Sequence, residues 1–316
     1  MDQAQPGSSV QHPLWRRIWD YPLVAMVVAA ILVVFAMGVA GILAKRVIPP
    51  IPGFTSVMML YLIAVVILIP LYVFVIAKLG DPKKNDLRDP KLLRHLLSGL
   101  IGGTIIFSIA VAIAGALGIY RIVGVGSLNG LLPALIVPAI GAAVTEEILF
   151  RGILFRWLEQ FGGSWTALLL TSALFGAAHL NNPNASWIAA GGIAIEAGVM
   201  LGAAYMLTRS LWFPMGLHAA WNFTQGEVFD IPVSGTKVDG MVDARLSGDP
   251  LLTGNGFGLE ASVIAIVVAT LFGLWLLWRA IQKGELKRPM WVRGPAPAVN
   301  SAGTPEPDAL PPISGR

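Results

Sequence analysis

Long apolar segments separated by short polar stretches give the chain its pattern. Six of these segments contain no Asp, Glu, Lys or Arg, and each approaches or exceeds the roughly 20 apolar residues that cross a bilayer. They are 23–44, 54–77, 96–120, 122–145, 161–178 and 261–278. Two further segments, 187–208 and 210–225, qualify if Glu196 and His218 are tolerated within them. The pattern therefore predicts about eight transmembrane helices.

The amino-acid composition supports a membrane location. Hydrophobic residues make up 55% of the chain and charged residues 13%, whereas about a quarter of the residues are charged in a typical soluble domain. We therefore expect an all-α fold, a polytopic integral membrane helix bundle. The chain contains no cysteine, which excludes disulfides, thiolate nucleophiles and sulfur-ligated metals.

The positions of Lys and Arg predict the orientation in the membrane. They cluster at 16–17, 78–94 and 279–293, and the positive-inside rule places such clusters on the cytoplasmic side. We therefore expect a multi-pass protein of a bacterial plasma membrane, with both termini cytoplasmic and the first apolar segment retained as an anchor. The net charge of +4 reflects this bias, so anionic membrane lipid is an expected partner and nucleic acid is not.

Three regions follow from these patterns. Residues 1–20 are expected to form a cytoplasmic N-terminal segment, and residues 21–283 the membrane-embedded domain. Residues 284–316 are expected to be a disordered cytoplasmic tail, because they contain too many prolines for a packed element. The Gly-rich segment 226–256 should be a loop that covers the outer mouth of the bundle.

Ionisable side chains are rare inside the apolar segments. Each costs a few kcal/mol to bury in a bilayer, so such residues usually face a cavity or a partner. For Glu196 we favour a structural role in which it pairs with a buried donor. The full set is Glu146, Glu147, Arg151, His179, Glu196 and His218, with Asn222 one helical turn after His218.

The stretch AAVTEEILFRGILF places three of these charges on one predicted helix. Glu147 and Arg151 lie four residues apart with the acid first, which favours an ion pair on one helix face. We favour a purely structural role for Arg151. Glu146 points about 100° away around the helix, so it is the glutamate left for chemistry.

The predicted depth of the polar residues allows them to meet. Pro133 and Pro138 predict a break, so the helix that carries Glu146 should begin near residue 141 and end near residue 159. Glu146, His179 and His218 can then reach a common level in the outer half of the membrane. A buried histidine is more often a packing residue when taken alone, but three such groups on three segments favour chemistry.

A carboxylate and two imidazoles at one level can hold and activate a water molecule. The carboxamide of Asn222 and a histidine N–H can donate to the oxyanion of a tetrahedral intermediate. These groups together provide the machinery of peptide-bond hydrolysis.

Three short motifs resemble a known family. EEILFR, FGAAH and HAAWN, read as E-E-x-x-x-R, F-x-x-x-H and H-x-x-x-N on successive apolar segments, resemble the CAAX protease and bacteriocin-processing (CPBP) family of intramembrane proteases. This family contains the Ras-converting enzyme. The resemblance covers about 128–225 and implies an all-helical bundle with a membrane-embedded active site that cleaves peptide or protein substrates.

The resemblance also implies roles for individual residues. Glu146 would activate the water with His179, while His218 and Asn222 would stabilise the oxyanion. The remaining motif positions, with supporting roles, are Glu147, Arg151 and Phe175.

Two mechanisms have been described for this family, one metal-dependent and one glutamate-based. The chain lacks H-E-x-x-H, and a shell of Glu, His and Asn is incomplete for zinc. We therefore favour a reaction without a cofactor. Zinc is the alternative, with Glu146, His179 and His218 as its ligands.

Two other functions are compatible with buried polar groups. The first is a non-catalytic membrane protein of the same fold that binds a peptide, as an immunity factor or scaffold. The second is a transporter, although no inverted repeat is visible in the sequence. The complete set of water-activating residues favours the peptidase. The sequence does not identify its substrate.

Overall fold

The computed structural model describes residues 13–80 and 83–293, which fold as a helical bundle. Six helical segments in these ranges are long and apolar enough to cross a membrane. The protein is therefore a polytopic membrane protein, as the sequence predicts. The six segments are Pro22–Val47, Ser56–Lys78, Leu92–Ala116, Leu131–Asn181, Trp187–Thr208 and Val263–Gln282.

The elements follow one another in the following order, where η marks a 3-10 or π-helical segment. The first half contains α1 (Leu14–Trp19), α2 (Pro22–Ile42), η1 (Leu43–Val47), α3 (Ser56–Lys78), α4 (Leu92–Ala116), β1 (Tyr120–Val125), α5 (Leu131–Ala134), η2 (Leu135–Ala142), α6 (Ala143–Glu147) and η3 (Ile148–Phe155). The second half contains α7 (Arg156–Ala178), η4 (His179–Asn181), α8 (Trp187–Ile193), η5 (Ala194–Gly198), α9 (Val199–Thr208), α10 (Trp212–Phe223), η6 (Thr224–Val228), β2 (Val242–Leu246), α11 (Pro250–Thr253), η7 (Asn255–Phe257), η8 (Leu259–Ala261) and α12 (Val263–Gln282).

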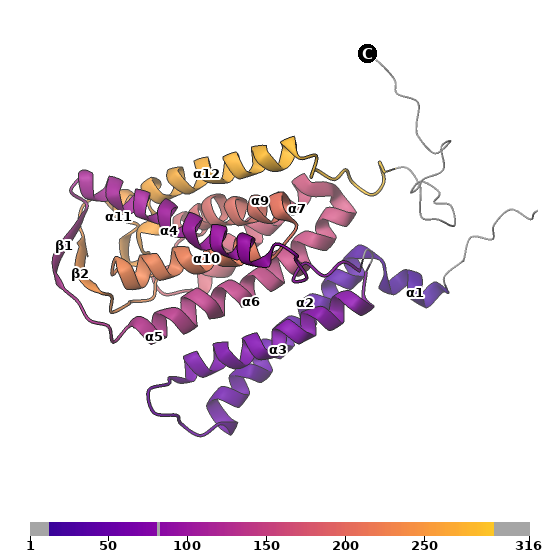
Figure 1. Cartoon of the computed structure of the whole chain (residues 1–316), viewed down its shortest axis with the longest axis horizontal. Coiled ribbons are helices and arrows are strands. Elements are labelled where there is room, and N and C mark those ends of the chain that lie inside the picture. The colour runs from indigo at the N-terminus through magenta and orange to yellow at the C-terminus, as the bar shows by residue number, and fades with distance from the viewer. Residues whose placement is uncertain (1–12, 81–82, 294–316) are drawn as a thin grey trace, which may run out of the picture.

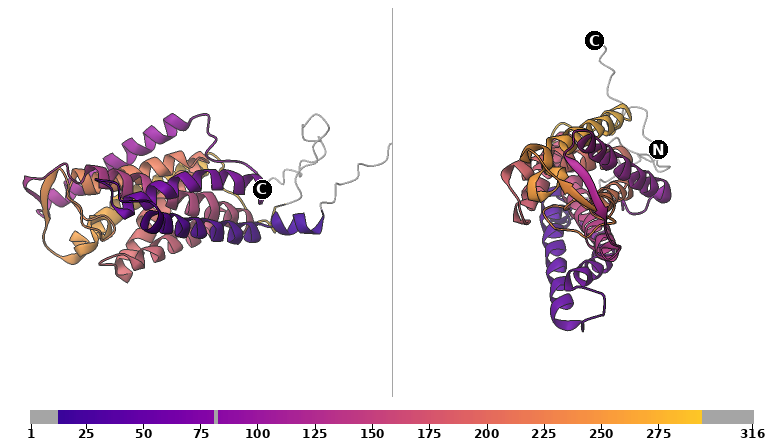
Figure 2. Two further views of the ribbon diagram at one scale, coloured as in Figure 1. Left: turned by 90° about the horizontal axis from the view of Figure 1, so that it is seen from below. Right: turned by 90° about the vertical axis from the view of Figure 1, so that its left-hand side faces the viewer.

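The long helices lie side by side along one axis (Figure 1). The β1–β2 ribbon, α5 and α11 lie at one end of the bundle, which we call the ribbon end, and α1 lies at the other end. Helices α2 and α3 form a hairpin along one flank. An end-on view shows that the ribbon crosses the end of the bundle (Figure 2).

Helix α10 is held in the centre of the bundle by very close packing against α4. A Cβ atom added at Gly99 would lie 2.4 Å from the carbonyl oxygen of Phe213, and one at Gly103 would lie 2.3 Å from that of Leu217. Only glycine allows the two backbones to approach so closely, as small residues generally do between membrane helices. Because α10 carries His218 and Asn222, this contact fixes the position of both side chains.

The helix around Glu146 begins earlier than the sequence predicts. Instead of starting near residue 141, it begins at Leu131 and continues through η2, α6 and η3 into α7. Pro138 lies inside the π-helical segment η2, and such a segment accommodates the missing proline N–H within a continuous helix. The helix continues past the predicted end near residue 159 to Gly163, where the backbone breaks with a φ of 80°.

The apolar segment 122–145 does not form one helix. Its first residues belong to β1, which pairs antiparallel with β2 so that Tyr120 lies opposite Leu246 and Val125 opposite Val242. A run of β-branched residues suits a strand as well as a helix, and the partner strand is far away in the sequence. The predicted number of eight helices stays a prediction, because α10 is short and 131–181 is interrupted at Gly163.

The segment after α12 is ordered, which corrects part of the predicted disordered tail. Residues 284–293 lie against the break in α7, where the Lys287 carbonyl accepts a hydrogen bond from the Ser164 N–H at 3.0 Å. The Phe161 carbonyl accepts another from the Met290 N–H at 3.0 Å. Residues 1–12 and 294–316 lie outside the described residues, so the predictions for those parts stay untested.

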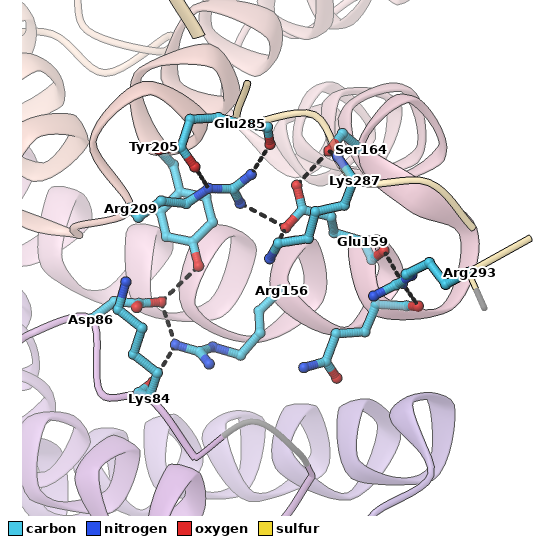
Figure 3. Close-up of polar contacts among 11 residues, drawn as sticks. Lys84, Asp86, Arg156, Glu159, Ser164, Tyr205, Arg209, Glu285, Lys287 and Arg293 are labelled. Carbon is cyan, nitrogen blue, oxygen red and sulfur yellow. Dashed lines mark hydrogen bonds and ion pairs between the residues drawn. The ribbon is translucent and has the colours of Figure 1, made fainter. Parts of the chain in front are cut away.

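A buried polar network joins this segment to the bundle (Figure 3). The Glu159 carboxylate accepts hydrogen bonds from Arg209 at 2.6 Å, from Lys287 at 2.8 Å and from the Ser164 hydroxyl at 2.6 Å. Nearby, Asp86 accepts from Arg156 and from the Tyr205 hydroxyl. The network fastens the end of the bundle that is remote from the β1–β2 ribbon.

Candidate active site

Glu147 and Arg151 form the predicted ion pair, and the pair holds three segments together. The Arg151 guanidinium lies 2.7 Å from the Glu147 carboxylate, and both side chains are completely buried. The other end of the guanidinium donates to the carbonyl oxygens of Ala197 and Gly198 in η5. The Arg151 cation also lies 4.8 Å from the centre of the Phe175 ring. Arg151 therefore joins Glu147 to the backbone of η5.

Glu147 also orients His218. The Nδ1 atom of His218 lies 3.1 Å from the same Glu147 oxygen that accepts from Arg151. A carboxylate paired with an arginine accepts hydrogen bonds, so Nδ1 carries the hydrogen and Nε2 is the free nitrogen of His218. This contact joins residues 71 positions apart in the sequence.

His179 is oriented in the same way by a backbone group. Its Nδ1 lies 2.8 Å from the Phe175 carbonyl oxygen, one turn earlier on α7. A carbonyl oxygen only accepts, so Nδ1 is again the protonated nitrogen and Nε2 is free. The Phe175 ring packs between the two imidazoles, with its centre 4.9 Å from that of His179 and 6.1 Å from that of His218.

Glu146 and Asn222 complete the predicted set. One carboxylate oxygen of Glu146, Oε2, is buried and has no hydrogen-bond partner among the residues described. Asn222 donates one N–H to the carbonyl oxygen of Pro138 at 2.8 Å, and this bond fixes its carboxamide. The second N–H of that carboxamide is then available to a ligand.

These groups share one cavity of about 670 Å³. Glu146, His179, His218 and Asn222 all line it, so the tertiary structure brings together the four residues predicted to be catalytic. Most of the segment 233–239 also lines the cavity. The region 226–256, predicted to be a loop, contains β2 and α11, and its position at the outer mouth stays a prediction. The catalytic roles themselves stay predictions.

The sequence interpretation assigned no site role to several further polar residues at the cavities, and three of them are close to the predicted catalytic residues or carry a buried charge. Tyr61 of α3 and the buried Glu227 of η6 line the main cavity. Glu260 of η8 lines a second, smaller cavity beside it, together with Glu196, His179 and His218. None of the three belongs to a motif, and only the charge of Glu227 and Glu260 close to apolar segments was visible in the sequence.

A zinc site can be tested against the same geometry. In residues 13–80 and 83–293, no group of three or more His, Asp or Glu side chains is placed to hold a metal ion. Glu146, His179 and His218 thus line one cavity without converging on one point. The choice between the two mechanisms stays a prediction.

Comparison with known proteins gives one match. Residues 128–224 match the family described as type II CAAX prenyl endopeptidase Rce1-like. This region, under a third of the chain, is similar to the CAAX protease family. No curated protein and no solved structure gives a significant match.

The CAAX protease match contains all three motifs and therefore all four residues predicted to be catalytic. It supports a protease and a membrane-associated substrate. Tyr61, Glu227 and Glu260 lie outside the matched residues, so the match assigns nothing to them.

Proposed function

We propose that the chain is an intramembrane endopeptidase that hydrolyses peptide bonds of membrane-associated proteins or peptides. The observation that carries this proposal is the shared cavity. It presents an unpartnered carboxylate oxygen, two imidazoles held through their Nδ1 atoms and an oriented carboxamide within the matched CAAX protease region. Burying such groups without a use costs free energy in a membrane protein.

The first step is activation of a water molecule. Glu146 accepts a proton from the water, because its Oε2 has no partner among the described residues and it lies beside His179 and His218 in the matched region. Glu227 lines the same cavity with both carboxylate oxygens unpartnered among the described residues, but it lies outside the matched region. His179 holds the same water through its free Nε2, since its Nδ1–H is fixed on the Phe175 carbonyl. The water oxygen then attacks the carbonyl carbon of the substrate.

The second step is stabilisation of the tetrahedral intermediate. The remaining N–H of Asn222 donates to the oxyanion. His218 enters the reaction already carrying a second proton on Nε2 and donates this N–H to the oxyanion, while Glu147 accepts its Nδ1–H and fixes the ring. Both protons stay on the ring throughout the reaction. Glu146 finally returns its proton to the leaving amine, which restores the starting state. Arg151 and Phe175 act by holding Glu147 and the two imidazoles in place.

A cleavage assay with the protein in lipid nanodiscs tests the proposal. A mixture of membrane-associated peptides is incubated with the protein, and mass spectrometry identifies the cut bonds. Glu146→Gln, His179→Ala and His218→Ala should each lower the rate by at least about 100-fold, the scale of general acid–base catalysis. Asp243→Asn, which changes an exposed carboxylate on β2 outside the cavity, is the matched control and should cleave like the unmodified protein.

The same experiment separates catalysis from peptide binding. Cleavage by the Glu146→Gln protein at the unmodified rate refutes the proposed role of Glu146. If the unmodified protein cuts none of the peptides but binds them, and Glu146→Gln binds equally well, the non-catalytic peptide-binding protein replaces the peptidase as the explanation.

A further inference from the structure

A second cavity lies directly behind the catalytic one. Its volume is about 20 Å³, and Phe175, His179 and His218 contribute to its wall. Two buried acids, Glu196 from η5 and Glu260 from η8, also line it. Neither acid takes part in the reaction described above.

Glu260 fixes the segment that separates the two cavities. Its Oε1 accepts a hydrogen bond from the Ser234 N–H at 2.5 Å, and its side chain is 2% exposed. Ser234 lines both cavities and has a φ of 47°, in the left-handed region that a residue other than glycine adopts only when its surroundings hold it there. Glu260 therefore anchors the wall of the substrate cavity to the segment that precedes α12.

Neighbouring contacts make this wall rigid. Gln225 donates to the Pro232 carbonyl at 2.5 Å, and the Gly235 N–H donates to the Phe257 carbonyl at 2.7 Å. The segments 231–236 and 255–261 are thereby bonded to each other and to η6. A change at Glu260 is transmitted to the catalytic cavity through Ser234.

Glu196 has a buried carboxylate oxygen without a hydrogen-bond partner among the described residues. Its side chain is 1% exposed, and its Oε2 has no partner in the part of the chain that the structure describes. A void of about 20 Å³ exceeds the roughly 10–15 Å³ that one water molecule requires, and such a water needs two to four polar partners. The carboxylates of Glu196 and Glu260 would accept the two hydrogens of such a water. The other polar residues at the void are His179, His218, Asn222 and Ser234.

We propose that Glu196 and Glu260 are positioning residues that bind one water molecule behind His179, and that Glu260 also fixes Ser234 at the wall of the substrate cavity. This inference rests on the proposed peptidase function for its kinetic consequences. The water is distinct from the attacking one, because it occupies the smaller cavity. Its role is to keep the side chains of His179 and His218 in one arrangement. Displacing catalytic groups by about 1 Å costs about 100-fold in rate.

Two substitutions at Glu260 and one at Glu196 separate the effects. Glu260→Gln keeps an oxygen for the Ser234 N–H but removes the charge, whereas Glu260→Ala removes both. We expect Glu260→Ala to raise KM and lower kcat, with a loss of about 10–100-fold in kcat/KM, and Glu260→Gln to lose less than about 10-fold. Glu196→Gln should lower kcat with little change in KM, because Glu196 does not line the main cavity.

A readout that does not depend on activity keeps the inference testable by itself. The chain has four histidines, so the ¹⁵N spectrum of histidine-labelled protein is simple, and His179→Ala identifies the His179 signals. Glu196→Gln and Glu260→Gln should shift these signals, while Asp243→Asn should not. Folding is checked by the thermal midpoint of each variant.

The outcomes are distinct. Unshifted His179 signals in both Gln variants overturn the inference, and so do unchanged kcat and KM in Glu260→Ala. If the unmodified protein cleaves no peptide, the proposed function fails, yet shifted His179 signals still support the water site. A purely structural role for Glu260 would lower the thermal midpoint while the folded fraction keeps its kcat, KM and His179 signals, and this result also overturns the inference.

Discussion

Removal of the Glu159 charge should destabilise the bundle at the end remote from the ribbon. The Glu159 side chain is 1% exposed and lies 2.6 Å from Arg209, whose side chain is 12% exposed. Breaking such a buried pair by removing one partner costs about 3–5 kcal/mol. Arg209 keeps a second acid, Glu285, at 3.0 Å, so we expect the lower limit, about 3 kcal/mol, for Glu159→Gln.

The other cation of this cluster contributes much less. Lys287 lies 2.8 Å from Glu159, but its side chain is 44% exposed. Exposed ion pairs contribute about 0–1 kcal/mol. Lys287→Ala should therefore cost less than about 1 kcal/mol. Because Lys287 and Arg209 contact the same oxygen of Glu159, the Lys287→Ala variant is the matched comparison for Arg209→Gln.

Equilibrium unfolding in mixed detergent micelles measures these differences. A loss of about 3 kcal/mol corresponds to a change of about 100-fold in the unfolding equilibrium constant. The double variant Glu159→Gln with Arg209→Gln should lose less than the sum of the single losses, because the two groups form one pair. A loss below about 0.5 kcal/mol for Glu159→Gln, or equal losses for Arg209→Gln and Lys287→Ala, would refute this reasoning.

Three further predictions concern packing, ionisation and metal content. Gly103→Ala should cost about 1–3 kcal/mol and lower cleavage, because a Cβ atom there meets the Leu217 backbone of α10, whereas Gly38→Ala should be neutral because nothing lies within 4 Å. Burial, and then Asp230, raise the pKa of Tyr120 to about 12, so the stability advantage over Tyr120→Phe should be full below pH 10 and shrink as pH rises towards 12. Purified protein should contain well under one equivalent of zinc and keep its activity after treatment with a chelator and removal of the chelator.

Each of these predictions has an outcome that contradicts it. Equal stability of the Gly103→Ala and Gly38→Ala proteins would show that α4 and α10 can separate freely. The Tyr120 hydroxyl donates to the Phe229 carbonyl at 3.1 Å, so an unchanged stability difference between pH 9 and pH 11 would show that its ionisation is not linked to folding. Stoichiometric zinc, with activity lost on stripping and restored by zinc, would make His179 and His218 metal ligands.

The sequence by itself determined the properties that depend on neighbouring residues. Each charged residue within a membrane span costs free energy wherever it lies, so long uncharged apolar segments indicate membrane spans. These segments identified the protein as a polytopic helical membrane protein. Spacing of four residues placed Glu147 beside Arg151 because the helix repeat alone brings them together. The motifs also selected Glu146, His179, His218 and Asn222, which share the main cavity.

Only the tertiary structure decided the relations between distant residues. The pairing of β1 with β2, the contact between Glu147 and His218, and the meeting of Glu196 with Glu260 at the small cavity each join separate segments. Pro138 signalled a break in the sequence, but packing against α10 and a π-helical segment keep the helix continuous, and Asn222 donates to the Pro138 carbonyl. These relations join residues from separate segments, so they follow from how whole helices pack against one another.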